Sequence, residues 1–252
     1  MSSIKGIIFD YGGTIDTDGI HWGEFIWQEY VAAGVQVEKE TYRDAYVHGE
    51  RTLAKRPIIL PTDTFKELLI KKMALQFEYL RENAPNPTIN KEKEEEVALR
   101  CYKRVTDTLT RTRAIVERLS THYPIVLVTN FYGNMPVVLE EFGLNGYFKQ
   151  IVESSVVGLR KPDPALFALG TEALCLKPQE IVVIGDSYRK DIYPSATLGC
   201  HTVWLKKICW ADEPVEPGYS PTAIIDTLEM LPQIIEKLGG NNKNRTNHIY
   251  VL

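Results

Sequence analysis

Residues 7–18 read IIFDYGGTIDTD. A short apolar run, Ile7–Phe9, leads into Asp10, and two glycines and a threonine follow shortly after it. Such a run is typical of a buried strand, and an aspartate at its carboxyl end lies where α/β proteins tend to place their chemistry. Gly12 stands two residues beyond Asp10, where a second carboxylate would be useful, and it offers no side chain at all.

Further short apolar runs predict the rest of a buried sheet. They are Gly6–Tyr11, which contains the opening run, Pro124–Asn130, Gln150–Ser154, Ile181–Asp186 and His201–Leu205. Helical patterns lie between most of them, around residues 114–120, 136–142, 164–174 and 192–198. Strands that alternate with helices predict an α/β fold with a doubly wound, mostly parallel, Rossmann-like sheet.

The stretch from residue 19 to residue 110 has a different character. It holds amphipathic, charge-rich helical segments such as DTFKELLIKKMALQFEYL and no convincing strand. We therefore expect an α/β core of residues 1–18 and 111–238, a helical cap of residues 19–110 and a C-terminal tail of residues 239–252. The two crossings between core and cap, near 17–19 and 108–112, are expected to act as hinges. The final IYVL of the tail could add an edge strand or contact a partner.

Composition narrows the function. The net charge of −4 gives no basic surplus for nucleic acid. No apolar run reaches the length of a membrane span, and no secretory signal pattern precedes the first strand, so we expect a cytoplasmic protein without a membrane partner. The four cysteines show neither a Cys-x-x-Cys pair nor zinc-ligand spacing. They are predicted to be buried, reduced thiols.

Several polar residues are expected to meet at one edge of the sheet, because the carboxyl ends of parallel strands lie together. Four of them end predicted strands: Asp10, Thr129, Asn130 and Asp186. Lys161 precedes the helix that leads to the fourth strand, and Asp191 follows that strand. The edge therefore combines carboxylates, a hydroxyl, an amide and a lysine.

Four motifs occur in the order DYGGT, VTN, RKPDP and GDSYRKD. This series resembles the haloacid dehalogenase superfamily of hydrolases. The long helical segment between the first and second motifs is similar to the group whose cap is inserted after the first motif. The resemblance covers the whole predicted core, and it implies a hydrolase, most often a phosphatase, that acts on a small phosphorylated metabolite.

The resemblance assigns roles to these residues. Asp10 would attack phosphorus and form an aspartyl-phosphate, with Thr129 and Lys161 as further catalytic residues. The expected phosphate-binding residues are Gly13, Thr129, Asn130 and Lys161. The implied cofactor is Mg²⁺, with Asp10, Gly12 through its carbonyl, Asp186 and Asp191 as the metal site; Asp191 would hold a water of the metal or orient Lys161.

Gly12 departs from the pattern of most phosphatases of this superfamily, which carry an acid–base aspartate there. Either the leaving group is good, as in an acyl or aryl phosphate, or another residue supplies the proton. Candidates for such a replacement are Asp16, Asp18 and His21.

Three other interpretations remain open. The protein could be phosphonatase-like, with a cap lysine such as Lys39 or Lys55 forming a Schiff base. It could be a dehalogenase, although the intact acidic motif opposes this, or a catalytically weak protein that binds phosphorylated ligands or a partner. Several cap residues could line the site or simply form the cap core: Trp22, Trp27, Tyr42, Tyr46, His48 and Arg51.

Overall fold

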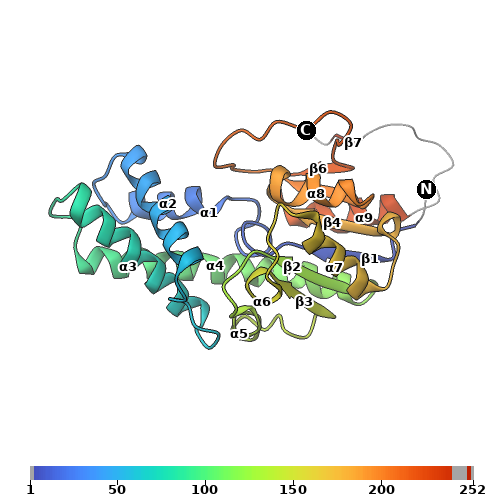
Figure 1. The fold of residues 1–252 in the computed structure, drawn as a ribbon, viewed down its shortest axis with the longest axis horizontal. Coiled ribbons are helices and arrows are strands. Elements are labelled where there is room, and N and C mark those ends of the chain that lie inside the picture. Colours follow the sequence, from blue (N-terminus) through green and yellow to red (C-terminus); the bar gives the residue numbers. More distant parts are fainter. Residues whose placement is uncertain (1–2, 240–248, 251–252) are drawn as a thin grey trace.

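A parallel sheet and a group of long helices lie side by side in the computed structural model, which describes residues 3–239 and 249–250 (Figure 1). The sheet has seven strands in the order β3-β2-β1-β4-β5-β6-β7, and every neighbouring pair is parallel. Its strands are β1 (Gly6–Phe9), β2 (Ile125–Thr129), β3 (Gln150–Glu153), β4 (Ile181–Gly185), β5 (His201–Leu205), β6 (Ala223–Ile225) and β7 (Ile249–Tyr250). This confirms the predicted α/β, Rossmann-like sheet.

Helices cover both faces of the sheet because its strands are apolar on both. Ile7 and Phe9 of β1 belong to one core cluster, and Ile8 between them belongs to the other. The first cluster includes residues of α5 (Met135–Glu141), α9 (Leu231–Gly239) and the end of α4 (Lys91–Ser120), and the second includes residues of α7 (Pro164–Leu174). The short helices α6 (Ser154–Val157), η1 (Pro178–Glu180), η2 (Tyr188–Ile192), α8 (Tyr193–Thr197) and η3 (Leu228–Met230) complete this part.

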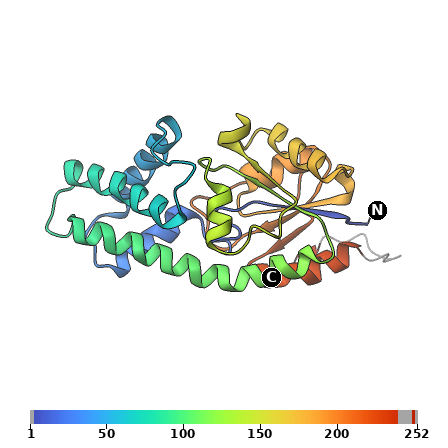
Figure 2. The same ribbon diagram turned by 90° about the horizontal axis from the view of Figure 1, so that it is seen from below.

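The segment between β1 and β2 is helical throughout its regular elements, as predicted. It forms α1 (Trp22–Ala32), α2 (Lys39–Lys55), α3 (Phe65–Asn83) and α4. We call residues 19–110 the helical insert. Figure 2 shows α4 running beneath both the insert and the sheet. The expected linker at residues 108–112 is wrong, because α4 continues through it without a break. Thr112 also fastens the helix there by donating a hydrogen bond to the Ile15 carbonyl at 2.8 Å.

The C-terminal third departs from the prediction in one respect and matches it in another. Strand β6 was not predicted, since three residues are too few for a clear apolar pattern. Ile249 and Tyr250 of the predicted tail pair with β6, which matches the expected edge strand. The rest of that tail, residues 240–248 and 251–252, lies outside the described residues.

The cysteines are only partly as predicted. All four are free thiols, but burial holds for Cys101 and Cys200 alone. Cys175, at the end of α7, is exposed, and Cys209 is partly exposed. No helix in the described part of the chain is both long and apolar enough to cross a membrane.

Candidate active site

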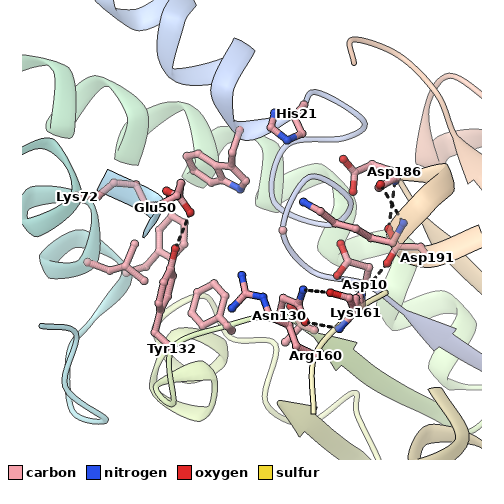
Figure 3. A pocket seen from close by; sticks show the side chains of 18 of the residues that line it. Asp10, His21, Glu50, Lys72, Asn130, Tyr132, Arg160, Lys161, Asp186 and Asp191 are labelled. Carbon is pink, nitrogen blue, oxygen red and sulfur yellow. Dashed lines mark hydrogen bonds and ion pairs between the residues drawn. The ribbon is translucent and has the colours of Figure 1, made fainter. Parts of the chain in front are cut away.

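A cavity of about 140 Å³ lies between the carboxyl ends of the central strands and the helical insert (Figure 3). Strand order reverses at β1 and β4, which is the position where open α/β sheets bind their ligands. The structure brings seven of the predicted site residues to its wall: Asp10, Gly12, Thr129, Asn130, Lys161, Asp186 and Asp191.

Three carboxylates meet on the sheet side of the cavity. One oxygen each from Asp10, Asp186 and Asp191 lies within 4.8 Å of the others. Lys161 connects two of them, with its Nζ 2.5 Å from Asp10 Oδ1 and 2.7 Å from Asp191 Oδ1. Asp186 forms no ion pair in the described part of the chain, so the cluster retains a negative charge that a cation could neutralise.

The turn after β1 shapes this cluster. Thr14 Oγ1 lies 3.1 Å from Asp10 Oδ2 and 3.4 Å from Asp186 Oδ1, so its hydroxyl bridges two strand ends. Gly13 has a φ of +95° and touches the Asp186 carboxyl so closely that a Cβ would collide with it. A glycine is therefore needed at residue 13 for both reasons.

Two loops fix Lys161 and Asp191. The Asn130 side chain accepts a hydrogen bond from the Lys161 N–H at 2.9 Å and donates one to the Lys161 carbonyl at 3.2 Å. Asp191 lies in η2 and accepts a hydrogen bond from the Ser187 N–H at 3.1 Å. The lysine and its two carboxylate partners are thus held from three separate strand ends.

Burial dominates the electrostatics of this cluster. It raises the pKa of Asp10, and the positive charge of Lys161 opposes that shift. Burial, followed by the negative charges of Asp191 and Asp10, raises the pKa of Asp186 well above its usual range. The two carboxylates hold the pKa of Lys161 above its ordinary value despite burial, so the ammonium stays charged.

The cluster fits a hard divalent cation. Carboxylate oxygens are the ligands that Mg²⁺ prefers, and repulsion among these three is relieved by positive charge. Asp10 and Asp186 would hold the ion together with the carbonyl of Gly12, which also lines the cavity. Asp191 already binds Lys161, which matches the second of its two expected roles.

The Gly13 amide is not free for a ligand. Its N–H donates a hydrogen bond to Asp16 Oδ1 at 2.7 Å, and Gly13 is not among the cavity-lining residues. The structure therefore gives no support to Gly13 as a phosphate-binding residue. The Asp16 carboxyl also accepts a hydrogen bond from Trp22 Nε1 at 2.9 Å, and burial raises the pKa of Asp16 to about 7.

The three candidates to replace the acid–base aspartate absent at residue 12 differ in burial and in their contacts. Asp16 is fully buried and does not line the cavity. Asp18 is structural, because it accepts hydrogen bonds from the Leu228 N–H at 2.8 Å and from Lys207 Nζ at 3.1 Å. Only His21 reaches the cavity. Burial, then the charge of Lys190, lowers the pKa of His21 to about 4.

His21 is neutral for a structural reason as well. Its Nδ1 accepts a hydrogen bond from the Gly23 N–H at 3.0 Å and so caps the start of α1. The ring proton of the neutral side chain is then on Nε2. A neutral imidazole is a poor proton donor to a leaving group, so none of the three candidates has the position and protonation state of the missing aspartate.

The insert side of the cavity holds a polar group that was not predicted. Lys72 Nζ lies 2.8 Å from Glu50 Oε1, and the Tyr132 hydroxyl donates to Glu50 Oε2 at 3.1 Å (Figure 3). Burial opposes the charge of Lys72, but Glu50 outweighs it and holds the pKa of Lys72 above its ordinary value. A sequence signal existed: Lys72 shares the buried face of α3 with Leu68 and Leu69, where a lysine is unusual.

The aromatic candidates divide between the cavity and the interior of the insert. Trp22 and Tyr46 line the cavity, whereas Trp27 and Tyr42 are absent from its wall and contact each other, with ring centroids 5.1 Å apart. His48 and Arg51 line a separate open cleft between α2 and α3. Lining residues that were not predicted include Phe65, Phe131, Arg160, Ser187 and Lys190.

Comparison with known proteins agrees with this geometry. The chain matches the haloacid dehalogenase-like hydrolase family over residues 4–196. It is 30% identical over 100 residues to a glyceraldehyde 3-phosphate phosphatase of Pyrococcus furiosus, which covers 40% of this chain and 42% of that protein. It is 33% identical over 79 residues to a phosphoserine phosphatase of Thermus thermophilus, covering 31% and 30% of the two chains. The chain thus matches less than half the length of these curated relatives.

Solved structures share the fold over most of their length. The HAD-hydrolase YfnB of Bacillus subtilis, bound to magnesium, has a TM-score of 0.57 at 18% identity, covering 93% of this chain and 99% of that one. The L-2-haloacid dehalogenase RSc1362 has a TM-score of 0.60 at 15% identity, covering 93% and 100%. The family match spans most of the chain and contains all four motifs, and the chain is a member of the haloacid dehalogenase-like hydrolase family.

Proposed function

We propose that this protein is a magnesium-dependent hydrolase of a small phosphate ester or anhydride that reacts through an aspartyl-phosphate at Asp10. One observation carries the proposal: Lys161 lies between Asp10 and Asp191, and Asp186 stands beside them without a cation partner in the described part of the chain. This arrangement suits a dianionic phosphoryl group and a divalent ion better than it suits a neutral substrate. The similar curated phosphatases support the same reaction class.

Different residues supply the nucleophile, the positive charge and the hydrogen bonds of the proposed reaction. Asp10 attacks phosphorus in line with the leaving oxygen, while Lys161 neutralises charge on both the nucleophile and the phosphoryl oxygens. The Thr129 hydroxyl and the backbone amide of Asn130 are placed at the end of β2 to donate hydrogen bonds to the phosphoryl group. When bound, Mg²⁺ supplies further positive charge between the carboxylates and the incoming phosphate.

We further propose that the helical insert acts as the cap of this site, over a core of residues 1–18 and 111–238. The insert contributes His21, Trp22, Tyr46, Glu50 and Lys72 to the cavity wall, so the wall is complete only while the insert stays against the sheet. Closure would exclude water from the reaction. Because α4 is continuous, any movement of the cap bends that helix or changes the turn at 17–19.

A phosphonatase-like reaction is less consistent with the cavity. Schiff-base formation needs a neutral amine, and the buried lysine of the insert, Lys72, is held as an ammonium by Glu50. The two lysines considered from the sequence do not line the cavity: Lys39 pairs with Glu24 at 2.7 Å, and Lys55 lines the outer cleft. The reaction class proposed above requires no such amine.

The test is phosphate release from acetyl phosphate and 4-nitrophenyl phosphate, with MgCl₂ and with EDTA. We expect phosphate release with MgCl₂ but not with EDTA, and no phosphate release by Asp10→Asn. Asp226→Asn is the matched control, because Asp226 is an exposed carboxylate that follows β6 and does not line the cavity. Binding of aluminium fluoride and magnesium without turnover would instead support a ligand-binding protein. Halide release from 2-haloacids in EDTA would support a dehalogenase.

A further inference from the structure

We propose that the substrate is an aryl phosphate, the phosphate monoester of a small phenol, whose leaving group departs as phenolate without a general acid. This inference rests on the proposed function and names its substrate class. It stands on two features of one cavity: the aromatic side chains that line it, and the position of one of them, Trp22, over Gly12.

Aromatic rings line the cavity from both parts of the molecule. Trp22, Tyr46 and Phe65 come from the insert, and Phe131 and Tyr132 come from the loop after β2. Trp22 and Phe65 have ring centroids 5.8 Å apart, and those of Phe131 and Tyr132 are 5.2 Å apart. These separations are usual for aromatic pairs, so a further ring between the walls would meet edges and faces that favour it.

Gly12 opens directly onto one of these rings. A Cβ placed on Gly12 would lie 3.7 Å from Trp22 Nε1 and 3.8 Å from Trp22 Cδ1, an ordinary contact distance. The indole is fixed there because its N–H donates to the buried carboxyl of Asp16. The edge of the indole, with its N–H already bound to Asp16, thus occupies the space beyond Gly12, where a proton donor to the leaving oxygen would be needed.

The buried ion pair on the insert side of the cavity adds no net charge. Lys72 is neutralised by Glu50, and its Nζ lies 5.6 Å from the ring centroids of both Trp22 and Tyr132. Arg160 and Lys190, the other two lining cations outside the acidic cluster, are exposed. The cavity of about 140 Å³ also has to hold the phosphoryl group, which limits the leaving group to a small one.

The reaction balances without an added proton donor. Asp10 forms its bond to phosphorus as the bond between phosphorus and the phenolic oxygen breaks, and both electrons of that bond stay on the oxygen. A phenol has a pKa of about 10, as tyrosine does, so phenolate is a tolerable leaving group and takes its proton from water afterwards. Water then hydrolyses the aspartyl-phosphate, which restores Asp10 and releases inorganic phosphate.

The experiment compares kcat/KM for three probes with magnesium. Phenyl phosphate has the ring and the phenolate; benzyl phosphate has the ring but leaves as an alkoxide; acetyl phosphate has a good leaving group without a ring. We expect phenyl phosphate to exceed benzyl phosphate by at least about a hundredfold, the lower end of what a general acid usually supplies. In Trp22→Leu, the phenyl-to-acetyl ratio should fall about tenfold, as expected for losing one aromatic contact.

Trp27→Leu is the matched control and should leave both ratios unchanged, because Trp27 is a half-buried residue of α1 that does not line the cavity. Comparable hydrolysis of benzyl and phenyl phosphate would overturn the inference, as would a Trp22→Leu variant whose phenyl-to-acetyl ratio equals that of the wild type. In either case, Asp10-dependent hydrolysis of acetyl phosphate would leave the proposed function standing. Failure on all three probes would instead contradict the proposed function itself.

Discussion

Asn130 holds Lys161 by both ends of its side-chain amide, accepting from the Lys161 N–H at 2.9 Å and donating to the Lys161 carbonyl at 3.2 Å. The end of β2 therefore sets the position of a lysine 31 residues later in the chain. Lys161 is only 4% exposed, so its ammonium has little freedom once its backbone is fixed. This contact makes Asn130 a positioning residue for Lys161.

We expect Asn130→Ala to lower kcat by about 10- to 100-fold, because a misplaced catalytic group commonly costs that much. The free energy of unfolding should fall by about 1–3 kcal/mol, since two partly buried backbone groups lose their partner. Asn130→Asp is the informative comparison, because it keeps the acceptor and loses the donor. An alanine variant with wild-type kcat would show that Lys161 does not depend on this contact.

Asp10→Asn should reduce kcat by at least about a thousandfold, because the amide cannot attack phosphorus. It should not lower the melting temperature of the metal-free protein. The mutation removes a negative charge that burial disfavours and that repels Asp186 and Asp191. Phosphate release and thermal unfolding, measured on the same sample, check both parts. Substantial magnesium-dependent turnover in this variant would exclude Asp10 as the nucleophile.

Magnesium should stabilise the folded protein, because a ligand that binds only the native state adds about 2.7 kcal/mol at a hundred times its Kd. Asp186→Asn should abolish the rise in melting temperature on adding MgCl₂, since it removes the carboxylate that has no cation partner in the described part of the chain. Asp226→Asn should retain the full rise. Equal rises in both variants would place the metal elsewhere.

His21 should make the protein less stable in acid. Its pKa in the folded state is about 4, below the ordinary value of 6.5, mainly because of burial. The unfolded chain therefore binds more protons between these values, and stability is lost as the pH falls from 6.5 towards 4. His21→Asn preserves a helix-capping side chain at the start of α1 and removes this titration. Melting temperatures at pH 7 and pH 5 should differ less in the variant than in the wild type.

The sheet and its acidic edge could be predicted because their signals are local. Each of the five predicted strands contains a short apolar run, and Asp10 and Asp186 directly follow two of the observed strands. Strand β6 has only three residues and depends on its pairing with β5, which no local pattern encodes. The continuity of α4 could not be predicted, because the end of the charge-rich helical segment near residue 110 suggested a domain boundary. In the structure one helix packs against both parts.

The insert side of the site could not be predicted in the same way. Glu50, Lys72 and Tyr132 come from α2, α3 and the loop after β2, and their contacts depend on how the helices pack. Of these three residues, only Lys72 had a signal in the sequence, because it is a charged residue on the buried face of a helix. The contact between Gly12 and Trp22 likewise needed the fold, although the absence of a side chain at residue 12 was evident from the sequence.

Restoring a carboxylate by Gly12→Asp should selectively help substrates with poor leaving groups. Gly12 is not in the left-handed region, and a Cβ there makes only ordinary contacts, so the backbone can accept the substitution. Trp22 has to shift for the new carboxyl to reach a leaving oxygen, because the indole lies directly beyond that Cβ.

The measurement is the ratio of kcat/KM for an alkyl phosphate to that for an activated aryl phosphate, in wild type and Gly12→Asp. A ratio cancels any uniform loss of active protein. We expect it to rise about tenfold or more, because an alkoxide needs a proton as it leaves and a nitrophenolate does not. The double variant Gly12→Asp with Trp22→Phe, which removes the indole N–H and reduces the ring, should raise it further. An unchanged ratio in folded, magnesium-binding variants would mean that leaving-group protonation does not limit this enzyme, or that another residue already supplies the proton.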